Sequence, residues 1–466
     1  MRTLLALFVL SSCGSNPPPP IHTIEIEMMT VTPIVAPHTH PAITVATKNP
    51  PYRLGIRSVE VLHTVAARKE PRTDAAVLGI ISAGTRAGVR DAIASGPECR
   101  GSDGVDGRWI ELAPRGWVCE NAVEPSEAPP TAAAVPSFDD DDDRPIHGVY
   151  GVVRGANATA YASRADVLAD AGRVLTGSNT VRASGTAVVD GRRFWRTSQG
   201  ELIDEASIVQ ISPSRFKGVA IEDPHAMPAW VRSHRDSTKS IVTYDAPSLH
   251  GRIVGARAPR ATVTVMELSS DGAFVRVADA EWVDRRDLRV ATVATPPPET
   301  GPGEKWFDID RDEQVLVAYE GERPVYATLV STGKYLHETP TSVARVASKL
   351  EHAVMSSDKE SVYSVADVPW TMYYDRDFAL HTSYWHDGFG SPRSHGCVNL
   401  APRDARVLYQ WSSPDVPPGW TAVYGDEDHP GSLVRVRSRK DPEPGFRGYA
   451  RAMHDKVVAV RESRDG

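Results

Sequence analysis

Ser394-His395-Gly396-Cys397-Val398-Asn399 is the stretch that decides how this 466-residue chain is interpreted. It places a cysteine between a glycine turn and the expected start of a helix. A second histidine, His381, lies sixteen residues upstream of Cys397, at the end of a short apolar run. A thiol attacks carbonyl groups only as the thiolate, and imidazole is the usual side chain that removes its proton. Backbone amides near Gly396 and Cys397 are candidate donors to a developing oxyanion, because glycine lets a backbone approach a substrate closely. The pattern predicts acyl transfer through a thioester.

The surrounding segments predict a mainly β domain that delivers the cysteine on a loop. Alternating apolar residues indicate strands at 315–319 and 325–329, and residues 421–424 and 433–436 indicate two closing strands. Pro402 to Trp411 has the spacing and the early proline of a helix. Trp370, Met372 and Tyr374 alternate in a further strand, where they fit a substrate groove or the core equally well.

The motif resembles the signature of the L,D-transpeptidases of the YkuD family, which is a histidine, a spacer, and then Ser/Thr-His-Gly-Cys-x-Asn/Arg. Neighbouring segments are similar too: Trp306 to Asp310, Gln314 to Tyr319, Ser331-Thr332-Gly333, Thr339-Pro340 and Val368 to Met372. The resemblance covers about residues 304–437. Ser342 departs from it, because the family usually has glycine there, and this leaves the shape of that loop open.

The resemblance implies a role for each motif residue. Cys397 is the nucleophile, and His381 takes the thiol proton and returns it to the leaving amine. Thr382 orients the imidazole through its backbone carbonyl. His395 supports the loop, with its backbone and that of Gly396 near the oxyanion.

The flanking motif residues have less specific roles. Ser394 is expected to stabilise the same turn and to lie at the substrate. Asn399 is expected to bind the substrate or to hold the loop in place, with an N-cap of the following helix as the alternative.

Other interpretations of these residues are also possible from the sequence. His386, expected in a loop, competes with His381 for the role of base. Cys397 alone would fit a buried structural thiol. A zinc site from His381, His386, His395 and Cys397 is the rival chemistry, but these spacings form no compact ligand pair such as Cys-x-x-Cys, so we expect no metal. The resemblance implies no cofactor.

The N-terminus predicts export. An apolar run from Leu4 to Leu10 is too short to span a bilayer and indicates a signal peptide. Leu10-Ser11-Ser12-Cys13 resembles a bacterial lipobox, which would make Cys13 the lipidated first residue of the mature chain; the alternative is an ordinary signal peptide. Gly14 in the next position favours, by resemblance, the outer membrane. We therefore expect a periplasmic lipoprotein of the cell envelope that meets the membrane only through its lipid.

Two further cysteines, Cys99 and Cys119, lie close together in an exported chain, which predicts a disulfide between them. An oxidising compartment supports export. It also requires that Cys397 stay reduced or lack a partner.

Three internal segments share a pattern of strand, tight turn, short strand and apolar plug. They begin at Trp109, Phe194 and Phe274. Repetition at this spacing argues for an array. The segments resemble bacterial Src-homology-3-like domains, which either bind wall peptides or act as spacers.

The expected division of the chain follows from these features: a signal peptide (1–13), a Pro-rich tether (14–50), Src-homology-3-like domains (51–125, 147–215 and 216–294), linkers (126–146 and 295–303), a catalytic domain (304–439) and a tail (440–466) with a short helix. The aspartates 139–143 fall in a linker, where a solvated run is favoured over a calcium site. The net charge of −8 and the lack of a basic stripe argue against nucleic acid as a partner.

The sequence thus predicts an enzyme, a cysteine-dependent acyltransferase. By resemblance it would act on peptidoglycan stem peptides, release D-alanine and form 3→3 cross-links, or attach an envelope protein through an amine. The alternatives are hydrolysis of the same thioester, giving an L,D-carboxypeptidase or endopeptidase, and a non-catalytic wall-binding lipoprotein.

Overall fold

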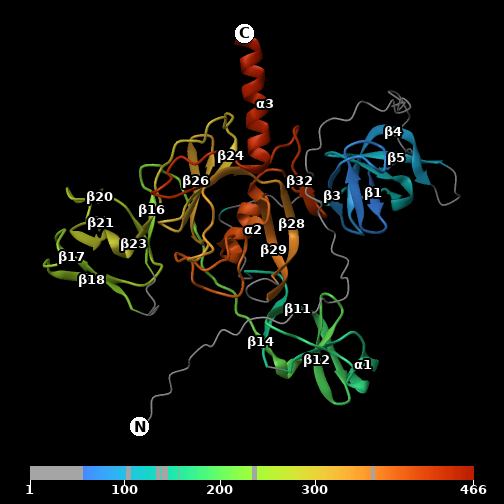
Figure 1. The fold of residues 1–466 in the computed structure, drawn as a ribbon, viewed down its shortest axis with the longest axis horizontal. Coiled ribbons are helices and arrows are strands. Elements are labelled where there is room, and N and C mark those ends of the chain that lie inside the picture. The colour runs from blue at the N-terminus through green and yellow to red at the C-terminus, as the bar shows by residue number, and fades with distance from the viewer. Residues whose placement is uncertain are drawn as a thin grey trace.

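The computed structural model describes residues 56–100, 106–132, 138, 145–155, 157–232, 239–357 and 363–465. The signal peptide, the lipidation of Cys13, the tether and the aspartates 139–143 lie outside these residues. The described chain is mainly β, as the sequence predicted. Three small β modules surround a larger central domain, which holds the Cys397 motif (Figure 1).

The first module runs from residue 58 to residue 126. Its elements are β1 (Ser58–Val61), β2 (Val65–Arg68), β3 (Val77–Ile81), β4 (Arg86–Arg100), β5 (Asp106–Ala113), β6 (Trp117–Cys119), the 3₁₀ helix η1 (Glu120–Ala122) and β7 (Val123–Ser126). Neighbouring strands follow the order β7-β1-β4-β5-β6-β2-β3. The open edge at β3 is covered by a strand of the central domain, β32 (Trp420–Tyr424), which pairs with it antiparallel.

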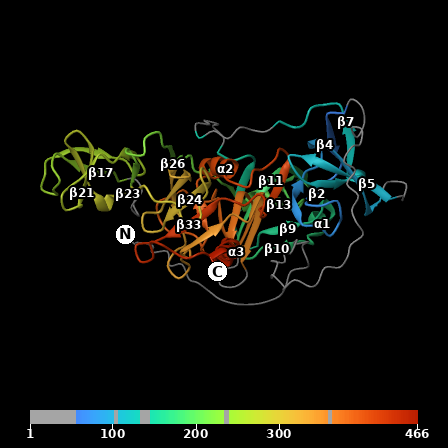
Figure 2. The same cartoon turned by 90° about the horizontal axis from the view of Figure 1, so that it is seen from above.

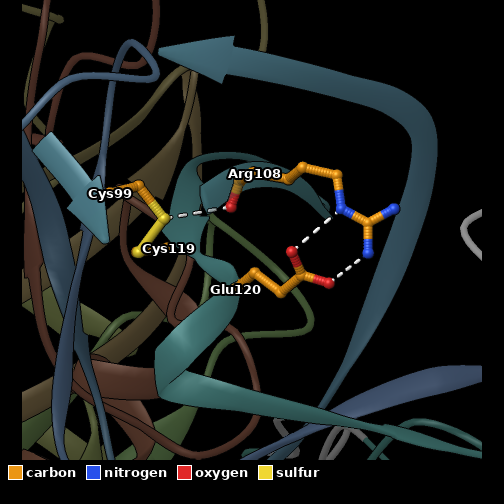
Figure 3. Close-up of a disulfide and its surroundings, with 4 residues drawn as sticks. All are labelled: Cys99, Arg108, Cys119 and Glu120. Carbon is orange, nitrogen blue, oxygen red and sulfur yellow. Dashed lines mark hydrogen bonds and ion pairs between the residues drawn. A yellow bond between two sulfur atoms is a disulfide. The ribbon is translucent and has the colours of Figure 1, made fainter. Parts of the chain in front are cut away.

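A disulfide joins Cys99 at the end of β4 to Cys119 at the end of β6, the pair that the cysteine count predicted. Figure 3 shows the bridge beside a bidentate ion pair between Arg108 and Glu120. The disulfide sulfur of Cys99 also lies 3.1 Å from the carbonyl oxygen of Arg108. These contacts fix the long β4–β5 hairpin to the short strand β6.

The second module runs from residue 149 to residue 210. Its elements are β8 (Val149–Val153), β9 (Thr159–Tyr161), α1 (Arg164–Ala169), β10 (Arg173–Val174), β11 (Ser178–Val189), β12 (Arg192–Thr197), β13 (Leu202–Asp204), η2 (Glu205–Ser207) and β14 (Ile208–Gln210). Ser163 caps α1 by accepting from the Asp166 N–H. The start of β11 pairs in parallel with a central strand, β29 (Tyr363–Asp375), and so joins this module to the central sheet.

The third module runs from residue 228 to residue 290 and contains two small sheets. Its elements are β16 (Pro228–Val231), β17 (Ile241–Tyr244), β18 (Ile253–Arg257), β19 (Thr262–Thr264), β20 (Glu267–Leu268), β21 (Phe274–Ala278), β22 (Glu281–Asp284), η3 (Arg285–Asp287) and β23 (Leu288–Val290). One sheet has the order β19-β16-β23 and the other β18-β17-β22-β21-β20.

The three modules share one succession of elements at their ends: strand, tight turn, short strand, 3₁₀ helix and strand. This is the pattern that the sequence repeats. The predicted barrels differ from what is found, because no closed barrel forms among the described residues. In the first two modules, strands β3 and β11 pair with the central domain instead, which offers their free backbone groups another partner.

The central domain is built from two sheets that share one strand. Its elements are β24 (Lys305–Asp310), β25 (Val315–Glu320), β26 (Arg323–Ser331), β27 (Ser342–Arg345), β28 (Ser348–Ser357), β29, β30 (Phe378–Thr382), β31 (Val398–Leu400), α2 (Pro402–Trp411), β32, β33 (Leu433–Arg437) and, after them, α3 (Gly448–Asp465). One sheet has the order β26-β25-β24-β33-β27, and the other the order β26-β31-β30-β29-β28-β32. The expected strands at 315–319, 325–329, 421–424 and 433–436 and the helix at 402–411 are confirmed.

The core of this domain lies between the two sheets and α2. Its buried members include Phe307, Leu316, Leu380, Val398 and Leu408. Trp370, Met372 and Tyr374 belong to the same core and are at most 8% exposed, so they do not line an open groove. Burial of this apolar surface holds the motif strand β31 in place.

The segment between the second and third modules crosses the central domain as an added edge strand. This strand, β15 (Val219–Ala220), pairs antiparallel with β26. Gly218 permits the close approach, because a Cβ there would lie 2.4 Å from the Ala327 carbonyl oxygen. Ile221 then enters the core that contains Trp306 and Tyr319.

Two perpendicular views agree on the arrangement of the modules. The third module lies on one side of the central domain and the first module on the opposite side (Figures 1 and 2). Helix α3 extends away from the body in Figure 1 and is the helix expected in the tail. Within the described residues, no helix has the length and the apolar character needed to cross a membrane.

Candidate active site

The loop before β31 has a shape that only glycine permits at its centre. Gly396 has a φ of 123°, and a Cβ added there would lie 2.5 Å from the ring of Phe378. The Ser394 hydroxyl accepts from the Gly396 N–H (3.1 Å) and donates to the Cys397 carbonyl (2.5 Å). Ser394 thus closes the turn, as expected. The Gly396 N–H is used inside the turn, so it does not face a substrate in this conformation, contrary to our expectation; the Cys397 N–H is the remaining candidate.

The two strands that hold the motif residues run parallel and side by side. Leu380 of β30 pairs with Val398 of β31, and His381 pairs with Asn399. Paired residues of neighbouring strands face the same side of a sheet, and side chains alternate along each strand. Continuing this alternation back by one residue from the start of β31 puts Cys397 on the same face as His381 and Asn399. Residues sixteen apart in the sequence are thereby brought to adjacent strands.

The His381 imidazole is buried and has a defined tautomer. Its Nδ1 lies 2.8 Å from the carbonyl oxygen of Thr382. A carbonyl only accepts, so Nδ1 carries the proton and Nε2 keeps a free lone pair. Burial lowers the pKa of His381 to about 4, and the contact with Thr382 offsets this only in part. The ring is therefore neutral near pH 7 and has its basic nitrogen available.

Cys397 is the free cysteine of the described residues and is partly exposed. Its thiol donates weakly to the Asp377 carbonyl, with the sulfur 3.6 Å from that oxygen. Burial raises the pKa of the thiol to about 11, although a hydrogen bond from the Ala379 backbone favours the thiolate. At these pKa values the thiol and the imidazole are both neutral near pH 7.

Asn399 is 3% exposed and lies beside a second histidine. Its side-chain amide is 3.0 Å from Nε2 of His386, whose Nδ1 accepts from the Gly388 N–H at 3.2 Å. The Asn399 atom in this contact is the amide nitrogen Nδ2, a donor, and its Oδ1 is buried without a hydrogen-bond partner among the described residues. Both nitrogens of His386 are used, whereas Nε2 of His381 is not.

The alternative role of Asn399 as a helix cap is wrong. Helix α2 begins at Pro402, and its N-cap is Ala401, which makes no side-chain cap bond. Asn399 lies inside β31 instead. Pro402 removes an amide that would otherwise need a capping partner, so the helix starts without an Asn, Ser or Asp cap.

His395 is exposed on the outer side of the loop. Its Nε2 is 3.1 Å from Nζ of Lys334, and its ring meets that of His337 at 4.9 Å between centroids. The backbone N–H of Lys334 donates to the Ser394 carbonyl at 3.0 Å. His395 therefore connects the motif loop to the loop that follows β26, which is the supporting role expected for it.

The loop from Ser383 to Gly390, called here the 383–390 loop, follows β30 and covers the histidines. Trp385 stacks on His381, with 5.9 Å between ring centroids and 28° between planes. Trp385 was not among the predicted site residues, and only its position four residues after His381 could have indicated it. Among the described residues, no three His, Cys, Asp or Glu side chains gather as a metal site would need.

A family model for the L,D-transpeptidase catalytic domain (YkuD) matches residues 304–435. The motif predicted this match, and these residues form an L,D-transpeptidase catalytic domain. No protein with a curated function matches the chain.

Solved structures of L,D-transpeptidases are similar to part of the chain. The catalytic domain from E. faecium is 23% identical, with 29% of this chain and 98% of that one covered and a TM-score of 0.23. The enzyme from Stackebrandtia nassauensis is 23% identical over 31% of this chain and 58% of that one, with a TM-score of 0.22. The enzyme from Mycobacterium smegmatis is 19% identical over 38% and 90%, with a TM-score of 0.23. Scores this low carry no argument about the whole chain, so the function rests on the family match and the site.

Proposed function

We propose that the protein is a peptidoglycan L,D-transpeptidase that works through a thioester on Cys397. The observation that carries this proposal is the orientation of His381, whose Nδ1 proton is held by the Thr382 carbonyl. Its Nε2 is thereby left free as a base, on the strand next to the one that begins after Cys397. The match of the surrounding residues to the catalytic-domain family supports the same reaction class.

In the acylation step, the Cys397 sulfur attacks an amide carbonyl of a stem peptide as Nε2 of His381 takes the thiol proton. Because the pKa of the thiol is about 11 and that of the imidazole about 4, proton transfer accompanies the attack rather than preceding it. The Cys397 N–H would donate to the oxyanion. As the C–N bond breaks, His381 returns the proton to the leaving amine of D-alanine, and a thioester remains.

In the second step, an acceptor amine attacks the thioester carbon and passes its proton to Nε2 of His381. The C–S bond breaks, and the sulfur recovers the proton from the imidazole. A side-chain amine of the third residue of another stem would give a 3→3 cross-link. A lysine of an envelope protein would give an attached protein instead. Asn399 and His386, which contact each other, would bind the stem peptide.

Hydrolysis is the alternative outcome of the same thioester, with water in place of the amine. A third candidate is a wall-binding protein without turnover, which the intact pair of Cys397 and His381 argues against. Incubating the purified chain with disaccharide tetrapeptides and weighing the products separates the three: dimers and free D-alanine, trimmed monomers, or no change. We expect dimers; Cys397→Ala should abolish turnover and keep the fold, and an active alanine variant would overturn the mechanism.

We also propose that the protein works in the cell envelope as a lipoprotein anchored through Cys13. The Cys99–Cys119 disulfide supports an oxidising compartment, since such bonds are rare in the cytosol. Labelling cells with a radioactive fatty acid tests this directly. Label should appear in the wild-type chain and be absent from Cys13→Ser, and an unlabelled wild-type chain would contradict the anchor.

A further inference from the structure

The 383–390 loop forms one wall of the site, and several of its contacts come from outside residues 304–435. Within the site it stacks Trp385 on His381 and places His386 against Asn399. Any movement of this loop therefore moves the ring that covers the base and the side chain that holds Asn399. The residues that hold this loop in position therefore also determine the geometry around His381.

The start of the loop is held by the second module. The hydroxyl of Tyr384 lies 2.7 Å from the hydroxyl of Thr180, which is in β11. The ring of Tyr384 packs on Tyr150 of β8, with 4.3 Å between centroids. Tyr384 is fully buried, so this contact is part of the core rather than a surface touch.

The middle of the loop is clamped at Asp387 by two residues from the region before the central domain. The Arg260 guanidinium, in the third module, donates to both carboxylate oxygens of Asp387, with Nη2 at 2.6 Å. Nη1 of Arg260 also lies 3.2 Å from the backbone carbonyl of Asp387. The Ser214 hydroxyl donates to the same carboxylate. A bidentate arginine–carboxylate pair fixes orientation as well as distance.

The end of the loop is held by the third module and by the segment before it. Phe389, which is 1% exposed, stacks on Phe216 at 6.3 Å and meets His386 at 4.9 Å between ring centroids. Arg289 of β23 donates from Nε to the Gly390 carbonyl at 2.9 Å. The same guanidinium donates from Nη1 to the Asp312 carbonyl at 3.0 Å, and so links the loop to the turn before β25.

We propose that Arg260 is a positioning residue for the acyl-transfer reaction, and that the third module acts as a fixed support for the 383–390 loop. The Arg260 guanidinium holds Asp387, which is next to His386 in the chain. It thereby sets two contacts of the loop, that of His386 with Asn399 and that of Trp385 with His381. The module is thus part of the active site's construction rather than a spacer. This inference rests on the proposed function for its effect on turnover, but its structural part stands independently.

The test compares Arg260→Ala and Arg260→Lys with wild type in the full chain. We expect Arg260→Ala to lower kcat on disaccharide tetrapeptides about tenfold or more, with KM changed less than threefold, because Arg260 would act through Asp387 and the loop rather than on the substrate. Backbone hydrogen exchange of residues 383–390 should become at least about tenfold faster. Arg260→Lys keeps the charge but not the bidentate geometry. Its kcat and its loop protection from exchange should therefore lie between those of wild type and Arg260→Ala.

The matched control is Arg252→Ala. Arg252 pairs with Asp245 in the same module, with the Arg252 side chain 81% exposed and the pair far from the loop in sequence. This variant should keep wild-type turnover and loop exchange. A double-mutant cycle with Asp387→Ala adds a second check: if the pair acts as a unit, the double variant should be no slower than Arg260→Ala alone.

The outcomes separate the positioning proposal from the proposed function. Wild-type exchange and wild-type kcat in Arg260→Ala would overturn the positioning role, and so would equal losses in the Arg252→Ala control. If the wild-type chain turns over no muropeptide, the proposed function fails. In that case, hydrogen exchange of the 383–390 loop still shows whether Arg260 orders the site. The rate at which iodoacetamide alkylates Cys397 is a second such measurement.

Discussion

Replacement of Asp404 by asparagine should make the protein more stable at neutral pH. Asp404 lies in the first turn of α2 and is fully buried. Its Oδ1 accepts from the Gly218 N–H at 2.9 Å and from the Tyr326 hydroxyl at 2.7 Å, and its other oxygen accepts from the Thr328 hydroxyl. The carboxylate therefore ties the β15 segment and β26 to the helix that follows the motif.

The magnitude follows from the pKa of this carboxyl group. Burial raises it from 3.8 to about 6, although the three hydrogen bonds favour the charged form. A folded-state pKa above the unfolded value gives stability that is complete below pH 3.8 and is lost as the pH rises through about 6. At 1.36 kcal/mol per pKa unit, the ionised group costs about 3 kcal/mol at neutral pH. Asparagine does not titrate, so Asp404→Asn avoids this cost.

Asparagine can also keep every contact. Its oxygen accepts from the Gly218 N–H and the Tyr326 hydroxyl, while its NH₂ group donates to the Thr328 oxygen. The Thr328 hydroxyl then donates to the Leu329 carbonyl, which lies 3.4 Å away. Asp404→Ala is the contrasting variant, because it leaves these buried donors without an acceptor, which costs about 1–3 kcal/mol each.

The assay is urea unfolding of wild type and Asp404→Asn at a series of pH values. Unfolding is monitored through the hydrogen exchange of peptides from α2. This local probe is needed because a chain of several modules does not unfold in one step. Between about pH 3.5 and pH 7.5, the difference in unfolding free energy should move by about 3 kcal/mol in favour of the variant. A pH-independent difference would refute the reasoning, and so would a variant that is less stable than wild type at neutral pH.

Three further outcomes follow from the site and the first module. Gly396→Ala should lower turnover at least about tenfold with little change in overall melting, since a residue with a side chain resists a positive φ and has no room at this position; normal turnover would contradict the turn described here. The rate of turnover should rise with pH through about 4, as His381 becomes neutral, and then stay level, whereas iodoacetamide alkylation of Cys397 should keep rising towards pH 11. Coincident profiles for the two reactions would point to a preformed ion pair instead. Replacing Cys99 and Cys119 by serine should cost the first module about 3 kcal/mol for a loop of 20 residues, seen as a lower unfolding midpoint that reducing agent does not lower further.

The local chemistry of the site could be predicted from the sequence because it depends on short spacings. The positive φ of Gly396, the hydroxyl of Ser394 that closes the turn, and the carbonyl of Thr382 beside His381 all involve residues within three positions of one another. Helix α2 and strand β25 were predicted by the same kind of local pattern. The fold of the central domain followed from alternation and from the family resemblance.

The role of Asn399 was predicted only in part, because the local sequence also suggested a helix cap. An Asn shortly before a helix suggests a cap, but Ala401 and Pro402 start the helix two residues later. The partner of Asn399, His386, is thirteen positions away across a loop whose path no periodicity describes. The predicted barrels failed for a related reason, because alternation marks a strand without telling which strand will pair with its edge.

By itself, the sequence determined which residues make up the reactive motif: a cysteine, a histidine and a turn glycine at spacings that fold into one turn and two neighbouring strands. The tertiary structure alone decided what holds them in position. Arg260 and Asp387 are 127 positions apart, and Gly218 and Asp404 are 186 apart. Contacts at such separations form only when independently folded segments pack together, and their energy comes from desolvated surfaces and paired charges that no local pattern records.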